Sequence, residues 1–130
     1  MKESTYLRVI YKAYKKGLSV VGPSYVANKL GISKVTAYEA LLKLAELDYG
    51  TYIPKKGFML NNKGVRVGRE VTRKHRLIEC FLAELDMTSE NACKEATRIE
   101  CFVSDLLIKA LEKKYGDREF CPCGYSLQVK

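Results

Sequence analysis

Apolar side chains recur every three or four positions through three segments of the N-terminal part of the chain. This spacing predicts amphipathic helices over residues 5–16, 25–30 and 34–47. In the third segment, the apolar positions expected to face a core are Val35, Ala40, Leu41, Leu44 and Leu47. The first third of the chain is therefore predicted to be helical, with each helix burying one face.

The residues between these segments are typical of helix ends. Gly17 and Gly31 follow the first two segments, and Ser24 and Ser33 can cap the second and third. A short helix, a turn containing glycine and a longer helix predict a helix-turn-helix, with a plain helical hairpin as the alternative. The N-terminal residues of the second helix would then enter the major groove of DNA. The predicted DNA contacts are Ser33, Lys34, Thr36 and Tyr38, with Lys43 on the phosphate backbone.

The pattern changes to short β-prone runs over residues 49–53 and 58–60. Between them lie Pro54, Lys55, Lys56 and Gly57, a composition typical of a tight turn. A basic hairpin directly after a recognition helix commonly rests on the phosphate backbone or in the minor groove. We therefore predict a winged helix-turn-helix, with Lys55 and Lys56 contacting DNA at the tip of the wing.

Helical periodicity returns in the second half of the chain. A long helix is predicted over 65–85, basic at first and then apolar, followed by a helix from a Ser89 cap to about Cys101. Ser104 can cap the last helix, which extends through Lys114 and is expected to pack Leu106, Leu107, Ala110 and Leu111. The predicted fold class is mainly α: a winged helix-turn-helix domain at 1–64, and a helical dimerisation and metal-binding domain at 65–130.

The distribution of charge along the chain indicates a binding partner. The chain has 130 residues and a net charge of +8, but residues 1–76 hold 16 Lys and Arg against 5 Asp and Glu, whereas residues 77–130 hold 7 against 10. Clustered basic charge in the N-terminal part favours double-stranded DNA as the partner, with an anionic membrane surface or mere solubility as alternatives. No apolar run is long enough to span a bilayer and no signal peptide is evident, so a cytoplasmic location without membrane attachment is expected.

The five cysteines and the single histidine suggest a metal site. In the absence of a secretory signal, thiols are expected to be reduced or metal-bound. His75 and Glu79 lie one helical turn apart, which suits two ligands but also an ordinary polar pair. Candidate ligands on the following helix and the tail are Cys93, Glu100, Cys101, Cys121 and Cys123, with Glu100 and Cys101 in second place. Both tail sulfurs are expected to point the same way from an extended stretch. Thiolates with one imidazole suit Zn²⁺ first, with Fe²⁺ as an alternative.

Three sequence motifs resemble those of a known protein family. They are Thr5-Tyr-Leu-Arg-Val-Ile-Tyr11, Arg73-Lys-His-Arg-Leu-Ile-Glu79 and Ala96-Thr-Arg-Ile-Glu-Cys-Phe-Val-Ser-Asp105. Together with the order of elements, they resemble the diphtheria toxin repressor family of iron- and manganese-dependent regulators. The resemblance implies a homodimer, held by the helices after the winged domain, that binds a palindromic operator when metal is present. We expect a short member of this family, without the SH3-like domain of longer members.

The resemblance also assigns residues. His75, Glu79 and Cys93 match the His, Glu and His of the family's ancillary site. Of the family's primary site only Glu100 matches. Cys101 stands where histidine is usual, Thr97 where cysteine or glutamate is usual, and Thr5 where methionine or aspartate is usual. Cys121-Pro-Cys-Gly124 is similar to the Cys-Pro-His-Gly ending of some short members. We expect a site formed by His75, Cys93, Cys121 and Cys123, with Glu79 in support.

The leading hypothesis is thus a dimeric, metal-dependent transcriptional regulator, most simply a repressor, with Zn²⁺ as the expected metal and Fe²⁺ or Mn²⁺ as alternatives. The rivals are a winged-helix protein whose zinc is purely structural, a regulator that senses redox state through its thiols, and a metal-dependent hydrolase. The last has little support, because the chain offers one histidine and no second base.

Overall fold

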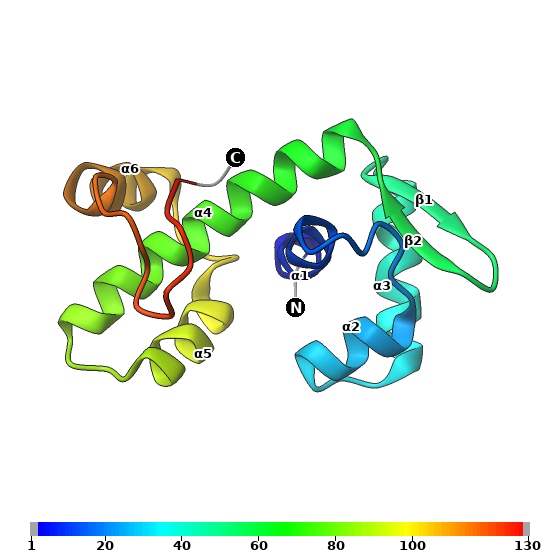
Figure 1. Ribbon diagram of the computed structural model, residues 1–130, viewed down its shortest axis with the longest axis horizontal. Coiled ribbons are helices and arrows are strands. Elements are labelled where there is room, and N and C mark those ends of the chain that lie inside the picture. The colour runs from blue at the N-terminus through cyan, green and yellow to red at the C-terminus, as the bar shows by residue number, and fades with distance from the viewer. Residues whose placement is uncertain (1–2, 129–130) are drawn as a thin grey trace. The chain divides into compact units, whose positions relative to one another are not determined.

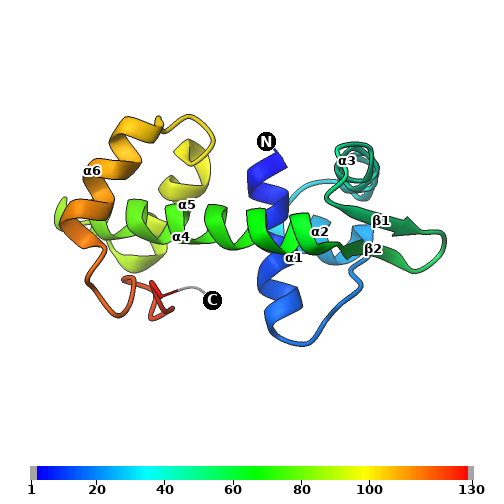
Figure 2. The same ribbon diagram turned by 90° about the horizontal axis from the view of Figure 1, so that it is seen from above.

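The computed structural model describes residues 3–128 and is mainly helical in that range (Figures 1 and 2). Two compact units meet between Arg69 and Glu70. The elements, in chain order, are α1 (Glu3–Lys15), α2 (Pro23–Leu30), α3 (Lys34–Glu46), β1 (Gly50–Ile53), β2 (Gly57–Leu60), α4 (Asn62–Glu84), α5 (Ser89–Ile99) and α6 (Asp105–Tyr115). Helix α4 is continuous through the boundary between the units, and the predicted boundary after residue 64 falls within its first turn.

The N-terminal unit is a winged helix-turn-helix, as predicted. Strands β1 and β2 pair antiparallel with Gly50 opposite Leu60 and Ile53 opposite Gly57, and Val21 adds an isolated bridge to Phe58. The interior of the unit is formed by side chains that are 0 to 2% exposed, namely Leu7, Ile10, Tyr11, Val26, Ala37, Leu41, Leu44 and Phe58. The packing of the three helices against the hairpin fixes the position of α3.

One glycine in the wing is required by geometry. Gly57 begins β2 with φ +134°, a conformation that L side chains rarely adopt, and a Cβ there would lie 2.3 Å from the Val21 carbonyl oxygen. The backbone of Val21 can approach Phe58 closely because Gly57 has no side chain. The Val21–Phe58 bridge, with N···O distances of 3.0 and 2.7 Å, joins the hairpin to the segment before α2.

Some expectations for this unit are wrong in detail. Val35 is 67% exposed and Leu47, expected in the same buried stripe, is 38% exposed. The buried face of α3 is set by Ala37, Leu41 and Leu44, so Val35 lies about 160° around the helix from Ala37, and Leu47 falls at the C-cap beyond the last turn. Helix α2 is capped by Gly22 instead of Ser24, because Pro23 occupies its first position.

The C-terminal unit packs α5, α6 and the end of the chain against the second half of α4. Its core cluster consists of Leu77, Ile78, Cys80, Leu82, Ala92, Ala96, Leu111, Tyr115, Cys121 and Leu127. Thr88, instead of Ser89, caps α5, and its hydroxyl accepts from the Asn91 N–H at 3.2 Å. Ser104 caps α6 as predicted, accepting from the Leu107 N–H at 3.2 Å.

Helix α6 buries a narrower face than expected. Leu111 and Tyr115 are buried, but Leu106 and Leu107 are 81% and 46% exposed and Ala110 is also exposed. Among residues 3–128, these apolar side chains of α6 therefore remain exposed. Within the described residues, no helix has the length and hydropathy needed to cross a membrane.

Candidate metal centre

Helix α4 carries the first two donors of the candidate site. His75 and Glu79 are one turn apart and project from the same face, with His75 Nε2 3.2 Å from Glu79 Oε1. Their side chains are only 5% and 2% exposed. A solvated polar pair would remain in water, so this burial argues against the plain surface pair that spacing alone allows.

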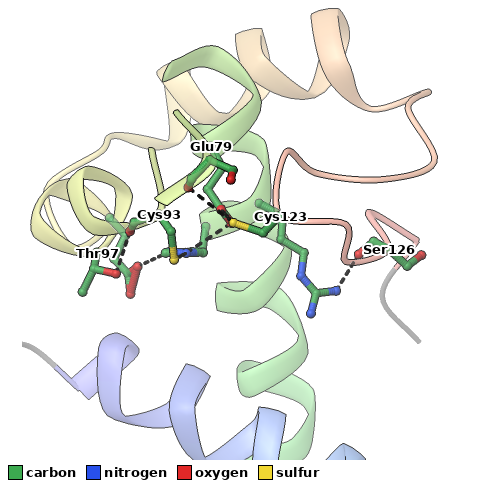
Figure 3. Close-up of polar contacts among 9 residues, drawn as sticks. Glu79, Cys93, Thr97, Cys123 and Ser126 are labelled. Atoms are coloured by element: carbon green, nitrogen blue, oxygen red, sulfur yellow. Dashed lines mark hydrogen bonds and ion pairs between the residues drawn. The ribbon is translucent and has the colours of Figure 1, made fainter. Parts of the chain in front are cut away.

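Helix α5 adds a thiol to these donors. Cys93 Sγ lies 3.6 Å from His75 Nε2. His75, Glu79 and Cys93 each offer one donor atom, and these three atoms all lie within 4.8 Å of one another. Figure 3 shows the Glu79 and Cys93 side chains in the same region, with a dashed line that joins Glu79 to Cys123. The Cys93 carbonyl oxygen accepts a hydrogen bond from the Thr97 hydroxyl at 2.9 Å, which occupies Thr97 on its own helix.

Glu100 contacts the opposite edge of the imidazole ring. Its Oε2 is 2.5 Å from His75 Nδ1, and the side chain is 4% exposed. A carboxylate at Nδ1 orients the ring and fixes the tautomer that leaves Nε2 free to bind a metal. The structure thus brings Glu100 to the site, as a partner of the histidine on the side away from Cys93.

The C-terminal part of the chain contributes a second thiol. The Cys123 Sγ–H donates to Glu79 Oε2 at 2.9 Å and to the Ser89 carbonyl oxygen at 3.4 Å. Burial, followed by the hydrogen bond to Glu79 and the charge of that carboxylate, raises the pKa of the Cys123 thiol well above its ordinary value. Metal binding by Cys123 would therefore release a proton that the metal-free protein holds firmly.

The two tail cysteines do not point the same way. Residues 121–124 form a tight turn, with the Gly124 N–H donating to the Cys121 carbonyl at 2.9 Å, so the predicted extended stretch is wrong. As a result Cys123 reaches Glu79, whereas Cys121 is 4% exposed in the apolar core cluster. Cys101, half-buried after the end of α5, is outside the group formed by His75, Glu79 and Cys93.

Two of the donor distances, both to His75 Nε2, match those around a tetrahedral cation. Zinc bonds of about 2.0–2.2 Å to N and O and about 2.3 Å to S, at tetrahedral angles, place N and O about 3.3 Å apart and S and N about 3.6 Å apart. The corresponding distances are 3.2 Å from His75 to Glu79 and 3.6 Å from His75 to Cys93. The donor set of one imidazole, one carboxylate and two thiols fits a divalent metal of intermediate softness.

The candidate DNA-binding residues lie on α3 and on the wing. Ser33 caps α3, accepting from the Thr36 N–H at 3.1 Å and donating to the Thr36 hydroxyl at 2.8 Å. The ring of Tyr38 meets that of Tyr52 on β1 edge to face at 5.4 Å. Every candidate on the two elements is solvent-exposed in this chain, namely Ser33, Lys34, Thr36, Tyr38, Lys43, Lys55 and Lys56. The exposed Val35 stands among them.

The sequence pattern does not single out two residues that bind the C-terminal part of the chain. Arg73 and Arg76 belong to the basic part of α4, and their guanidinium groups bind the backbone carbonyls of Gly116, Ser126 and Leu127. Their position on either side of His75 was visible in the sequence. Their partners were not, because residues more than 40 positions away become neighbours only after folding.

A winged helix with an exposed recognition helix, joined to a helical unit with a buried cluster of His, Glu and Cys donors, defines the class of metal-responsive DNA-binding regulators. Comparison with known families agrees. Residues 2–58 match the iron dependent repressor N-terminal DNA binding domain, and residues 61–126 match the iron dependent repressor metal binding and dimerisation domain. The chain belongs to the iron-dependent repressor family, which confirms the resemblance noted in the sequence and places the chain among transcriptional regulators instead of enzymes.

Individual relatives are similar over most of this chain. An uncharacterised HTH-type transcriptional regulator of Methanocaldococcus jannaschii, MJ0568, is 29% identical over 117 residues, which is 87% of this chain and 94% of the relative. A solved manganese-dependent transcriptional repressor in complex with manganese is 31% identical with a TM-score of 0.85, and ScaR with bound Zn²⁺ is 27% identical with a TM-score of 0.72. The matches cover 97% and 98% of this chain but only 58% and 59% of those solved chains.

Proposed function

We propose that the protein is a repressor that binds palindromic operators as a homodimer when a divalent metal is held by His75, Glu79, Cys93 and Cys123. The observation that carries the proposal is the buried group of donor atoms from His75, Glu79 and Cys93, all within 4.8 Å of one another. Cys123 is included because its sulfur lies 2.9 Å from Glu79. Since DNA is the partner, the site of action is the chromosome, in the cytoplasm.

Zn²⁺ is the proposed metal, ahead of Fe²⁺ and then Mn²⁺. Relatives of similar structure hold manganese in one case and Zn²⁺ in another, so the family does not decide the question. The donors of this chain favour zinc or iron, because thiolates select these metals over manganese, which prefers carboxylates and water. When bound, the cation would supply the positive charge that lets two thiolates, an imidazole and a carboxylate share one buried site.

The helical unit would transmit occupancy to DNA through α4. That helix holds His75 and Glu79 and begins at Asn62, directly after the wing. In the family's mode of binding, two recognition helices meet half-sites about one helical turn apart on the duplex. Ligands from α5 and the C-terminal end would restrict the movement of α4, and a homodimer with restricted helices would populate the spacing that DNA requires.

Metal content and ligand substitution test the proposed site. Purified protein should contain about one metal ion per chain by elemental analysis, and competition against a chromophoric chelator should give its affinity. Cys93→Ser and Cys123→Ser should each weaken binding strongly, whereas Cys101→Ser, a matched control for a half-buried thiol outside the group, should keep wild-type affinity. Full affinity in Cys93→Ser, or its loss in Cys101→Ser, would reject the ligand set.

A structural zinc site is the second candidate, favoured by the burial of His75 and Glu79 and by the three segments that the donors join. Chelation separates the two: a structural site should melt the helical unit, whereas a regulatory site should lose metal while helical circular dichroism persists. At Cys123 the redox-sensing alternative is less favoured, because the raised pKa of this residue keeps it as a thiol in the metal-free protein, and thiols oxidise slowly.

A further inference from the structure

Residues Glu119–Leu127, called here the C-terminal loop, form a closed structure with its own hydrogen bonds. The Leu127 N–H donates to the Glu119 carbonyl at 2.9 Å, and the Cys121 N–H donates to the Tyr125 carbonyl at 2.8 Å. An isolated bridge pairs Phe120 with Ser126. The loop therefore behaves as one small hairpin, with Cys123 in the turn at its tip.

Two arginines of α4 bind the base of this loop. The Arg76 guanidinium donates to the Ser126 carbonyl, the contact drawn at Ser126 in Figure 3, and lies 5.3 Å from the centre of the Tyr125 ring. The Arg73 guanidinium donates to the Leu127 carbonyl and pairs with the Glu112 carboxylate, Nε to Oε2 at 3.1 Å. Both arginines bind backbone oxygens, so these hydrogen bonds fix the path of the loop, and the Tyr125 ring adds a side-chain contact to Arg76.

The same stretch of α4 carries the two arginines and two of the proposed ligands. Arg73 and Arg76 lie two residues before and one residue after His75, and Arg76 is three residues before Glu79. One face of the helix thus anchors the loop while the adjacent face meets the thiol at the loop's tip. We propose that Arg73 and Arg76 are positioning residues that hold the C-terminal loop so that Cys123 is presented to the metal site.

This inference rests on the proposed function and makes Cys123 a conditional ligand. The thiol reaches Glu79 only while the loop is docked, and a ligand already placed in its bound position costs less conformational entropy on binding. By linkage, whatever favours docking favours the metal, and the metal in turn favours docking. The loop is consequently a part of the molecule whose order reports metal occupancy.

A double-mutant cycle tests the assignment in the full chain. Arg76→Gln should weaken Zn²⁺ binding by about 10- to 100-fold, the usual effect of removing a group that supports a ligand. In the Cys123→Ser background, the same Arg76→Gln change should have no further effect, because the ligand on which the arginine acts is gone. Lys74→Gln is the matched control, since Lys74 faces Asp105 at 3.9 Å on the surface; its affinity should equal that of wild type.

Hydrogen exchange provides the readout that a general loss of stability would not produce. In metal-free Arg76→Gln, the amides of Cys121 and Leu127 should exchange faster than in wild type, and saturating Zn²⁺ should restore their protection only where Cys123 is present. Equal weakening of Zn²⁺ binding by Arg76→Gln in both backgrounds would overturn the positioning role and leave the metal site intact. A wild-type chain with no affinity for Zn²⁺ would overturn the proposed site, and this inference with it.

Discussion

Glu100→Gln examines the least expected contact of the metal centre. The Glu100 carboxylate meets His75 Nδ1 at 2.5 Å, and both side chains are at least 95% buried. Glutamine keeps the shape and can still accept one hydrogen bond, but it removes the charge. A hydrogen bond to a charged group contributes about 1 to 1.5 kcal/mol more than a neutral one, which corresponds to roughly a five- to tenfold loss of metal affinity.

Competition titration with a chromophoric chelator at fixed pH measures that loss directly. Glu95→Gln is the control, because Glu95 lies on α5 in an exposed pair with Arg98 and should leave affinity unchanged. Co²⁺ absorption adds a second readout: if Glu100 acts only on His75, the visible spectrum at saturation should match that of wild type. Unchanged affinity would refute the orienting role, and a changed spectrum would show that Glu100 is itself a ligand.

Three further predictions address other parts of the structure. Cys121→Ser should lower the free energy of unfolding by about 1 to 3 kcal/mol, because it buries a hydroxyl in the apolar core, but should leave metal affinity intact. Cys123→Ser should instead lower metal affinity and leave the free energy of unfolding unchanged. If both variants changed metal affinity and unfolding free energy alike, the assignment of Cys121 to the core and Cys123 to the metal site would be contradicted. Burial, reinforced by Glu84, raises the pKa of Tyr115 from 10.0 to about 12. The folded state therefore favours the neutral phenol, so the stability it contributes is full below pH 10 and is lost as pH rises toward 12; Tyr115→Phe should flatten this part of the unfolding free energy against pH. Val35→Ala should change the unfolding free energy by less than about 0.5 kcal/mol, since Val35 is exposed, yet reduce selection for thymine at one position from random duplexes, because an apolar side chain in the first turn can contact the thymine methyl group. An unchanged base preference would exclude Val35 from recognition.

The fold was largely predictable because its helices are amphipathic and short turns separate them. The winged helix-turn-helix and the helices of the C-terminal unit follow from the apolar periodicity and from the glycine and serine residues at helix ends. Errors arose where neighbouring residues competed for one role. Thr88 and Ser89 can both cap α5, and the choice depends on where the helix begins. Val35 has an apolar side chain but no neighbour to bury it, which local pattern cannot reveal.

The candidate site was predictable in part for the same reason. One-turn spacing places His75 and Glu79 together, and the face of α5 directs Cys93 to them. Which edge of the imidazole Glu100 meets depends on how α4 and α5 pack, and this is not encoded in either helix alone. The separation of Cys121 from Cys123 depends on a turn in the C-terminal loop, and residues of α4 bind the backbone of that loop at Ser126 and Leu127. Long-range contacts of this kind have no local sequence signature.

Whether metal occupancy controls DNA binding is tested most directly by one titration. A duplex selected from a random pool would be titrated with protein at one fixed salt concentration, first loaded with Zn²⁺, then after chelation, then after Zn²⁺ is restored, with circular dichroism recorded at each step. If metal controls binding, DNA affinity should fall on chelation while the helical signal persists, and restored metal should recover the affinity. Specific DNA binding that is unchanged in folded, metal-free protein would contradict this control.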